Sequence, residues 1–598
     1  MSTLTLESLR RQYGEGRLTP SACVEQLLAR IDAAARPEVW ISRVPAATLL
    51  AEARQLDAML AEQGEGVFER LPLFGVPFAV KDNIDVAGMP TTAGCAEFAY
   101  VAAESATVVS KLLAAGALLV GKTNLDQFAT GLVGTRSPYG AVRNAHHPQY
   151  VSGGSSAGSA VAVALDLVSF ALGTDTAGSG RVPAGLNNIV GLKPSRGLLS
   201  TRGVVPACRS LDCVSVFAAT VADAWAVTAV ATGYDAAEPG SRQVQMLGAK
   251  QRGYKIAVPA APEFYGDVAA QRAFEQSLDQ LRALPNIDIG TIDFTPFREA
   301  AMLLYQGPWV AERMAAVGKP FFAAHGDAMN PVVAGIIRQA DKFDAVDGFN
   351  GQYRLAELRR AAEQQLDGYD LLLVPTAPTM PTLAAVEADP VARNSELGYY
   401  TNFVNFFDMA ALALPALPRA DGLPFGVTLI GACGADHRLA LAAQAFAPAW
   451  QSQHAQAALA PLPWNEPTVL LAVVGAHLEG QPLNWQLVER GARKCQSTRT
   501  KDCYRLHALA GTLPPKPGLE RVAEGGAAIE VEVWELPVRT FGQVVAEVPA
   551  PLGIGSVELA DGRWVKGFVC EGYAFAGARD ITAFGGWCAY LAERASAS

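Results

Sequence analysis

Two segments rich in glycine and serine, on either side of one apolar segment, constrain the fold of this chain most. The first is 153–158, Gly-Gly-Ser-Ser-Ala-Gly, and the second is 173–179, Gly-Thr-Asp-Thr-Ala-Gly-Ser. Small residues let the backbone turn sharply and bring its N–H groups close to a ligand. Such N–H groups can form an oxyanion hole, which stabilises the charge that develops on an attacked carbonyl oxygen.

From the residues alone, three interpretations compete for this region. The segments can be tight turns around a buried helix. Residues 154–158 also fit G-x-S-x-G with Ser156 as a nucleophile, although that motif must follow a strand and 146–150, His-His-Pro-Gln-Tyr, is a poor strand. The third interpretation, a phosphate-binding loop, requires the motif G-x-x-x-x-G-K-[ST], which this sequence does not contain. The first two interpretations remain open at this point.

Short apolar segments alternate with helix-like patterns along most of the chain. This alternation predicts an α/β fold in which helices cover both faces of a central sheet. The expected strands are 71–80, 117–120, 168–172 and 371–374, and the expected helices include 6–34 and 108–115.

The length of 598 residues indicates more than one domain. Around 455–467 the chain becomes rich in alanine and proline, which is typical of a linker. Beyond it short strands predominate. We therefore predict a first domain at 1–455, a linker at 456–467 and a second domain at 468–598.

The charge balance limits the partners of the chain. With 48 Lys and Arg against 58 Asp and Glu the net charge is -10, which argues against binding nucleic acid or an anionic membrane. The polar N-terminus does not resemble a signal peptide, and the nine cysteines show no metal-ligand spacing. We expect a cytoplasmic protein with reduced thiols and no bound metal.

Three linked motifs identify a family resemblance. They are Gly75 to Asp82 (GVPFAVKD), then GGSSAGS, then GTDTAGS with an arginine two residues on. The serines at 155 and 179 lie 24 positions apart. In these motifs the chain resembles the amidase signature family. The resemblance implies a mixed central sheet covered by helices, hydrolysis of an amide, and no metal or organic cofactor.

The resemblance also implies a Ser-Ser-Lys triad. Ser179 would be the nucleophile, Ser155 the bridging serine and Lys81 the base. Serine is a weak nucleophile until a neighbouring base takes its proton. Lysine can be that base only when it is neutral, which burial favours because it lowers the pKa. Lys81 follows the apolar segment 71–80, as a buried amine would.

The same family pattern assigns roles around the triad. The bond between Gly154 and Ser155 would be cis, and Asp175 and Arg181 would form a structural ion pair. The backbone N–H groups of the oxyanion hole would be those of Thr176, Ala177, Gly178 and Ser179.

Within the family, two segments resemble allophanate hydrolases: 173–185 and 303–313. The resemblance implies that Tyr305 and Arg313 bind the substrate carboxylate and that the Gly131 backbone lines the same pocket. Since eight residues make about two helical turns, we expect Tyr305 and Arg313 on one face of a single helix. The substrate would be allophanate. The alternative is another small-molecule amidase, of the biuret or malonamate type.

Residues 468–598 resemble the C-terminal domain of longer allophanate hydrolases through 474–478 and 577–587. This implies a small α+β, barrel-like fold similar to gamma-glutamylcyclotransferases, which would aid decarboxylation of N-carboxycarbamate or serve assembly alone. His477 is the candidate functional residue because histidine titrates near neutral pH, although a structural histidine is the alternative. We expect a homodimer or larger homo-oligomer and a complex with other enzymes of the urea or cyanuric acid pathway.

Overall fold

The computed structural model describes residues 4–450, 453–455, 457–460 and 466–596. The chain divides into two compact units. The first comprises Met1–Val244 and Tyr254–Pro463, and the second comprises Gln245–Gly253 and Trp464–Ser598. Residues 245–253, which the sequence analysis includes in the first domain, thus fold with the second unit. The predicted linker, 456–467, lies partly outside the described residues.

A mixed sheet forms the centre of the first unit. Strands β2, β5 and β6 are parallel neighbours, whereas β8, β7, β12 and β13 pair antiparallel. In spatial order the eleven strands found in the described part are β1 (Trp40–Arg43), β5 (Leu118–Thr123), β2 (Pro77–Lys81), β6 (Phe170–Asp175), β8 (Cys213–Ala218), β7 (Val190–Lys193), β12 (Ala410–Pro415), β13 (Gly426–Gly431), β11 (Leu371–Pro375), β9 (Tyr254–Pro259) and β10 (Ile287–Ile292).

The central strands are apolar because the sheet is covered. All residues of β2, β6 and β11 are buried, and up to the polar residues that end β2 and β6 their sequences are apolar runs rather than alternating ones. Such runs are typical of strands that are buried on both faces. The predicted α/β class with a large mixed sheet is confirmed.

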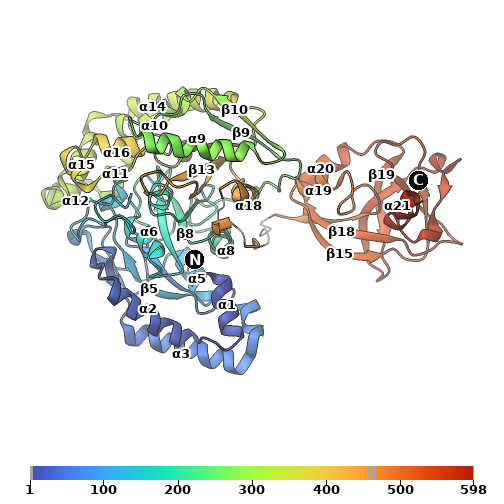
Figure 1. The fold of residues 1–598 in the computed structure, drawn as a ribbon, viewed down its shortest axis with the longest axis horizontal. Helices are drawn as coiled ribbons and strands as arrows, with labels where there is room; N and C mark the ends of the chain where they lie inside the picture. Colours follow the sequence, from blue (N-terminus) through green and yellow to red (C-terminus); the bar gives the residue numbers. More distant parts are fainter. Residues whose placement is uncertain (1–3, 451–452, 456, 461–465, 597–598) are drawn as a thin grey trace. The chain divides into compact units, whose positions relative to one another are not determined.

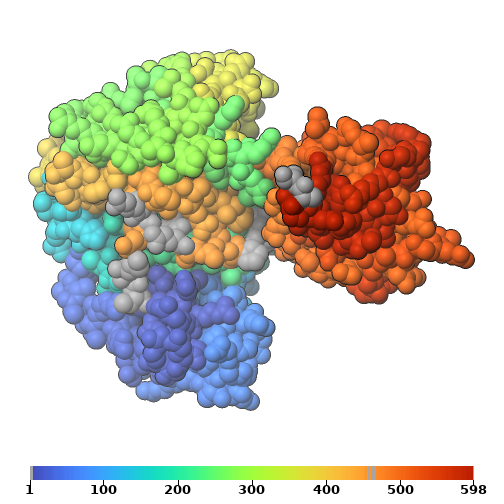
Figure 2. Space-filling view, turned by 45° about the vertical axis from the view of Figure 1, so that its right-hand side comes forward, coloured from blue at the N-terminus to red at the C-terminus, as the bar shows by residue number. Residues whose placement is uncertain are grey.

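Helices pack around this sheet. Figure 1 shows α9, α10 and α14 beside β9 and β10 at one end of the first unit and α1 to α3 at the other. In Figure 2 the orange segment, which holds β12 and β13, lies between the blue-to-cyan and green segments, as the strand order requires. The α-helices are α1 (Leu6–Gly14), α2 (Pro20–Ala34), α3 (Ala46–Gln63), α4 (Val67–Arg70), α5 (Thr107–Ala114), α6 (Ala157–Ala164), α7 (Val182–Leu186), α8 (Val221–Ala231), α9 (Val268–Arg282), α10 (Thr295–Gln306), α11 (Val310–Val317), α12 (Lys319–His325), α13 (Pro331–Arg338), α14 (Ala345–Gln365), α15 (Leu383–Ala388), α16 (Ala392–Leu397), α17 (Phe403–Phe406) and α18 (Asp436–Trp450).

The strand order brings the two glycine-rich segments together. The parallel neighbours β2 and β6 end at Lys81 and Asp175, so their carboxyl ends meet at one edge of the sheet. The 153–156 loop leads into the buried helix α6, which packs on β6. Ligands of open α/β sheets commonly bind at the carboxyl ends of strands.

The second unit has its own core, which includes Leu506, Trp534 and Ile529. One sheet has the order β15 (Arg493–Arg499), β18 (Glu530–Pro537), β14 (Thr468–Val473), β20 (Trp564–Cys570) and β19 (Leu552–Glu558). The other has the order β17 (Pro517–Arg521), β16 (Tyr504–Ala508) and β21 (Arg579–Asp580), and the α-helices are α19 (Asn484–Val488), α20 (Val538–Ala546) and α21 (Trp587–Ser596).

The 245–253 segment is closely packed in this second unit. A Cβ on Gly248 would lie 2.3 Å from the Val488 carbonyl oxygen and 2.4 Å from the Gly491 nitrogen. The Arg252 guanidinium lies 3.4 Å from the ring centre of Trp485. Over the whole described part of the chain, we find no helix with the length and apolarity that crossing a membrane requires.

Candidate active site

Lys81 is the last residue of β2 and is fully buried. Its Nζ donates hydrogen bonds to Ser155 Oγ and to Thr174 Oγ1, each over 2.7 Å. Burial lowers the pKa of Lys81 to about 7, against the opposing influence of nearby aspartates, of which Asp126 is the strongest. An amine with this pKa is available as a base near neutral pH.

The hydrogen bonds continue from the lysine to the second serine. Ser155 Oγ donates to Ser179 Oγ over 2.9 Å, so Lys81, Ser155 and Ser179 form one connected chain. The Gly154–Ser155 peptide bond is cis, which confirms that prediction. A Cβ on Gly154 would lie 2.1 Å from Asp126 Oδ2, so only glycine fits there.

Ser156, the nucleophile of the alternative G-x-S-x-G interpretation, is occupied elsewhere. Its Oγ donates to the Thr174 carbonyl oxygen over 3.1 Å and accepts from the Thr174 N–H. The hydroxyl therefore ties the first glycine-rich loop to β6 and is not presented to a ligand. The geometry favours Ser179 over Ser156.

The loop that follows β6 is held by an ion pair. Arg181 Nε and Nη2 lie 2.9 Å from the two oxygens of Asp175, and both side chains are fully buried. Although burial raises the pKa of Asp175, the Arg181 guanidinium brings it below its usual range. The predicted structural ion pair is confirmed.

The backbone N–H groups of this loop divide into two sets. The Gly178 N–H, which the sequence analysis places in the oxyanion hole, instead donates to Asp175 Oδ1 over 2.8 Å. Within the described residues, the N–H groups of Thr176, Ala177 and Ser179 have no hydrogen-bond partner. Because backbone N–H groups are rarely left unpaired in a buried segment, these three donors are the ones available to a ligand oxygen.

The side chain of Thr176 has its own anchor. Its Oγ1 donates a very short hydrogen bond to Asp212 Oδ1, and Asp212 also accepts from the N–H groups of Ala207 and Cys208. Burial raises the pKa of Asp212 to about 6. Asp212 thus connects the loop to the residues that precede β8.

Tyr305 and Arg313 meet, but not on one helix as predicted. Tyr305 lies on α10 and Arg313 on α11. The helix breaks at Gly307 and Pro308, because proline disfavours helical backbone at the residue before it. The two side chains still converge: Arg313 Nη2 lies 3.4 Å from Tyr305 Oη, and the guanidinium lies 5.1 Å from the tyrosine ring centre.

Thr130 and Gly131 adjoin this pair. Arg313 Nη1 donates to Thr130 Oγ1 over 2.7 Å. A Cβ on Gly131 would lie 2.6 Å from Asp126 Oδ2, which explains the glycine. Arg313 is 2% exposed and forms no ion pair with any described carboxylate. A buried cation that lacks a counter-ion is unusual and indicates a site for an anion.

Three residues of this region were missed by sequence reasoning: Thr174, Asp212 and Arg136. Thr174 lies inside the second glycine-rich segment, so its position beside the nucleophile loop was a usable signal. Asp212 and Arg136 lie in segments without a recognisable motif, and only the fold brings them to the site.

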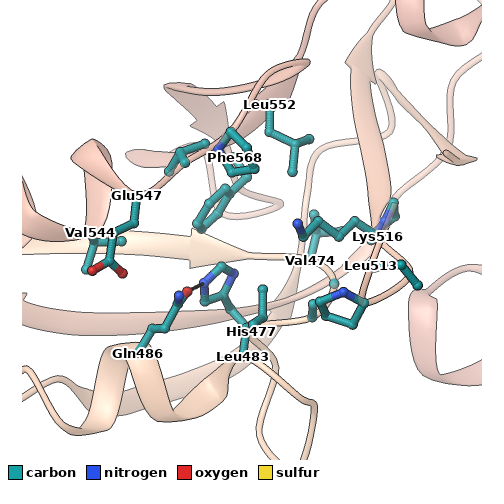
Figure 3. Close-up of a pocket in the computed structure, with 16 residues that line it drawn as sticks. Val474, His477, Leu483, Gln486, Leu513, Lys516, Val544, Glu547, Leu552 and Phe568 are labelled. Atoms are coloured by element: carbon teal, nitrogen blue, oxygen red, sulfur yellow. Dashed lines mark hydrogen bonds between the residues drawn. The ribbon is translucent and has the colours of Figure 1, made fainter. Parts of the chain in front are cut away.

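The second unit contains a separate cavity of about 250 Å³ around His477. Figure 3 shows the histidine hydrogen-bonded to Gln486, with Phe568 above it. His477 Nε2 donates to Gln486 Oε1 over 2.8 Å, and its ring stacks on Phe568 with centres 4.8 Å apart. Lys516 reaches toward the same space from another wall (Figure 3).

Charges around this cavity are mixed. Burial lowers the pKa of His477, the Gln486 hydrogen bond opposes this, and Lys516 lowers the pKa further. Glu547 also lines the cavity. The lowered pKa favours the neutral imidazole, whose charged neighbours are Lys516, Arg490 and Glu547. Among the described residues, no group of His, Cys, Asp or Glu side chains could hold a metal ion.

Comparison with known families gives two matches that together span most of the chain. Residues 22–440 match the amidase family, and residues 469–592 match the allophanate hydrolase C-terminal domain.

Similar proteins carry both parts. Urea amidolyase of Lachancea kluyveri is 45% identical over 96% of this chain, and urea amidolyase of Saccharomyces cerevisiae is 44% identical over 95%. The chain spans 32% of the length of each of these relatives. The structure of Kluyveromyces lactis allophanate hydrolase superposes with a TM-score of 0.89 at 41% identity, covering 98% of this chain and 99% of that one.

Proposed function

This chain belongs to the amidase family, and we propose that it hydrolyses the terminal amide of allophanate through a serine acyl-enzyme. One observation carries the proposal: the hydrogen-bonded chain Lys81–Ser155–Ser179 lies in the same unit as the buried Arg313, which has no counter-ion among the described residues. The first supplies the chemistry of amide cleavage. The second supplies a site for the carboxylate that distinguishes allophanate from a simple amide. The similarity to an allophanate hydrolase over nearly the full chain supports the same substrate.

In the proposed first step, Ser179 Oγ attacks the terminal carbonyl carbon of allophanate. Its proton passes to Ser155 Oγ, whose own proton passes to the neutral amine of Lys81. The carbonyl oxygen becomes an oxyanion and accepts from the free N–H groups of the loop, those of Thr176, Ala177 and Ser179. Removal of one such donor costs about 10²–10³ in rate in other enzymes.

Collapse of the tetrahedral intermediate breaks the carbon–nitrogen bond. The leaving amine takes a proton that returns through Ser155 from Lys81, and ammonia departs. Water then attacks the acyl-enzyme and gives up a proton along the same path, which regenerates Ser179 and releases N-carboxycarbamate. Each proton that Lys81 accepts is returned, so no cofactor is needed.

At the other end of the substrate, the carboxylate would lie against Arg313 and Tyr305. The planar guanidinium matches a carboxylate and the tyrosine hydroxyl can donate to it. The Gly131 backbone, next to Thr130, would line the same space. An anion here would pair with a guanidinium that is otherwise buried without a counter-ion.

The test is ammonia release by the purified chain from allophanate, biuret and malonamate. We expect the highest kcat/KM for allophanate and no activity in the Ser179→Ala variant. A fully active Ser179→Ala variant contradicts the mechanism. A preference for biuret, which is uncharged, would instead support the alternative of another small-molecule amidase.

The cavity around His477 supports a second role, in the decarboxylation of N-carboxycarbamate. In that step the nitrogen gains a proton as the carbon–nitrogen bond to one carboxylate breaks, giving carbon dioxide and carbamate. Lys516 is placed to attract the anion and, as an ammonium, to supply the proton, which the neutral His477 can accept and pass on to the nitrogen. In the alternative, this unit is an assembly module without chemistry.

Carbon dioxide and ammonia, measured together, separate these two alternatives. If the second unit acts on N-carboxycarbamate, His477→Gln slows carbon dioxide release while ammonia release from the first step continues at its normal rate. If the unit is an assembly module, both rates stay coupled and unchanged.

We further propose that the chain forms a homodimer. Val346, Phe349 and Tyr353 follow one face of α14 and are 63%, 58% and 63% exposed. Exposed apolar stripes of this kind commonly mark protein interfaces. Sedimentation of a Phe349→Glu, Tyr353→Glu variant should show monomers. An unchanged mass would place the dimer contact elsewhere.

A further inference from the structure

Arg136 is a second buried arginine beside the proposed carboxylate site. It is 2% exposed and follows the 126–134 loop. Its Nη1 donates to the Thr130 carbonyl oxygen over 3.1 Å, and its Nη2 donates to the Pro390 carbonyl oxygen over 2.7 Å. The Nε is buried and has no partner among the described residues.

Arg136 and Arg313 converge on one residue. Thr130 accepts Arg136 at its carbonyl oxygen and Arg313 at its hydroxyl oxygen. The Nε of Arg313 is also buried and unpartnered within the described part of the chain. Two guanidinium groups therefore face the same short segment, and each retains an unused donor.

The carboxylate with the strongest electrostatic influence on Arg136 is Asp126, whereas Asp212 and Glu312 act on Arg313. Asp126 accepts the N–H groups of Val133 and Gly134 at one oxygen and that of Arg136 at the other. Neither arginine forms an ion pair with a carboxylate that the structure describes. Burial lowers the pKa of Arg136, Asp126 opposes this, and the nearby Arg313 adds to the lowering.

Two like charges buried side by side are unfavourable unless an anion joins them. The protein places them there nonetheless, next to Thr130 and Gly131, where the proposed substrate carboxylate would bind. We propose that Arg136 is a specificity-determining residue, which supplies the second positive charge of an anion site shared with Arg313. This inference rests on the proposed function, since it deepens the account of the same pocket.

The second charge changes what the site selects. Arg313 with Tyr305 can hydrogen-bond either a carboxylate or a carboxamide, because both present an oxygen acceptor. Two cations together discriminate by charge, because the neutral carboxamide leaves them repelling each other. Arg136 would therefore contribute to rejection of neutral amides as well as to binding of the anion.

Malonamate and malonamide provide a matched pair of probes. They share one carbon skeleton and one amide to be cleaved, and differ only in whether the far end is a carboxylate or a carboxamide. The quantity to measure is the ratio of kcat/KM for malonamate to that for malonamide. In the Ser179→Ala background, the ratio of the two Kd values reports the same preference without chemistry.

Two substitutions separate charge from structure at this position. Arg136→Gln removes the charge and keeps a donor, whereas Arg136→Lys keeps the charge and loses the planar fork. A charge-assisted contact is worth about 1.5–3 kcal/mol, so we expect Arg136→Gln to lower the ratio about 10- to 150-fold. Arg136→Lys should restore most of the ratio.

If Arg136 acts only as a clamp on the Pro390 carbonyl, both variants reduce turnover of both amides alike and the ratio stays constant; that result overturns the inference. Arg313→Gln distinguishes failure of this inference from failure of the proposed function. If Arg313→Gln lowers the ratio and Arg136→Gln does not, only the role of Arg136 is wrong. If neither lowers it, the carboxylate site itself is misplaced.

Discussion

Asp212 offers a sharp test of how the site is held, because it acts on two parts of it. Its carboxylate accepts the Thr176 hydroxyl, which anchors the oxyanion loop, and its negative charge favours the ammonium form of Lys81. Replacement by asparagine keeps the shape and removes the charge. Asparagine has an NH₂ group in place of one carboxylate oxygen. One of the three donors that Asp212 accepts, from Thr176, Ala207 or Cys208, then faces another donor and loses its hydrogen bond.

The expected loss follows from these contacts. A hydrogen bond to a charged group contributes about 1.5–3 kcal/mol. If the Thr176 loop loses this energy in the transition state, the rate falls by about 10- to 150-fold. The loss reaches only the low end of that for deleting an oxyanion donor, about 10²–10³, because the backbone N–H groups remain. We therefore expect kcat for malonamate to fall about 10- to 150-fold in Asp212→Asn.

The charge has a second, independent consequence. In the proposed mechanism Lys81 acts as a base in its neutral form, so kcat/KM should rise with pH as Lys81 loses its proton near its pKa of about 7. Asp212 raises that pKa. Without the carboxylate the pKa of Lys81 falls further, and the acid limb of the profile moves to lower pH.

Thr176→Val is the matched control for this experiment. It removes the hydroxyl that Asp212 holds and keeps the carboxylate itself. Because that hydrogen bond lowers the pKa of Asp212, its loss leaves the carboxylate ionised only at higher pH. Ammonia release measured between about pH 5.5 and 8.5 should show reduced kcat in both variants and the larger displacement of the acid limb in Asp212→Asn. If Asp212→Asn keeps wild-type kcat and an unmoved limb, Asp212 neither anchors the loop nor influences Lys81, and the reasoning fails.

The remaining predictions concern stability and close packing. Arg181→Met leaves Asp175 buried and unpaired, so the free energy of unfolding in urea should fall by about 3–5 kcal/mol, whereas Arg354→Met, at an exposed pair, should change it by less than about 1 kcal/mol. An equal effect at both sites would contradict the burial argument. Gly154→Ala places a Cβ 2.1 Å from a carboxylate oxygen and should abolish activity or folded yield. Gly335→Ala meets nothing within 4 Å inside α13 and should stabilise by about 0.5–1 kcal/mol, as thermal denaturation would show.

Sequence patterns were enough to predict the fold class and those features of the site that depend on residues close together in the chain. The fold class followed from continuous apolar strands, and the cis bond before Ser155 and the ion pair of Asp175 with Arg181 followed from the family pattern. These features lie within, or next to, the two glycine-rich segments. Their geometry depends on neighbours in the chain, so a sequence pattern records it.

Features that depend on how a short segment turns were not predicted. Tyr305 and Arg313 were expected on one helix because the prediction used their spacing alone and did not weigh the helix break that Gly307 and Pro308 favour. The Gly178 N–H turns toward Asp175 because the buried carboxylate needs donors, which no local motif specifies. Arg136 reaches the site only because the loop that precedes it folds around Asp126.

Because residues 245–253 belong to the second unit, that unit is built from two separate stretches of the chain and cannot be removed by one cut. A cut before residue 468 removes most of the unit but leaves behind the backbone that fits against Val488 and Gly491 and the arginine that covers Trp485. A single-point truncation is therefore not a clean deletion, and the excised fragment lacks the segment that packs against Val488, Gly491 and Trp485. Gene fusion or fission at this boundary would need to transfer two separate stretches of coding sequence. In the laboratory, a synthetic peptide of residues 245–253 should bind the isolated fragment and restore its thermal stability.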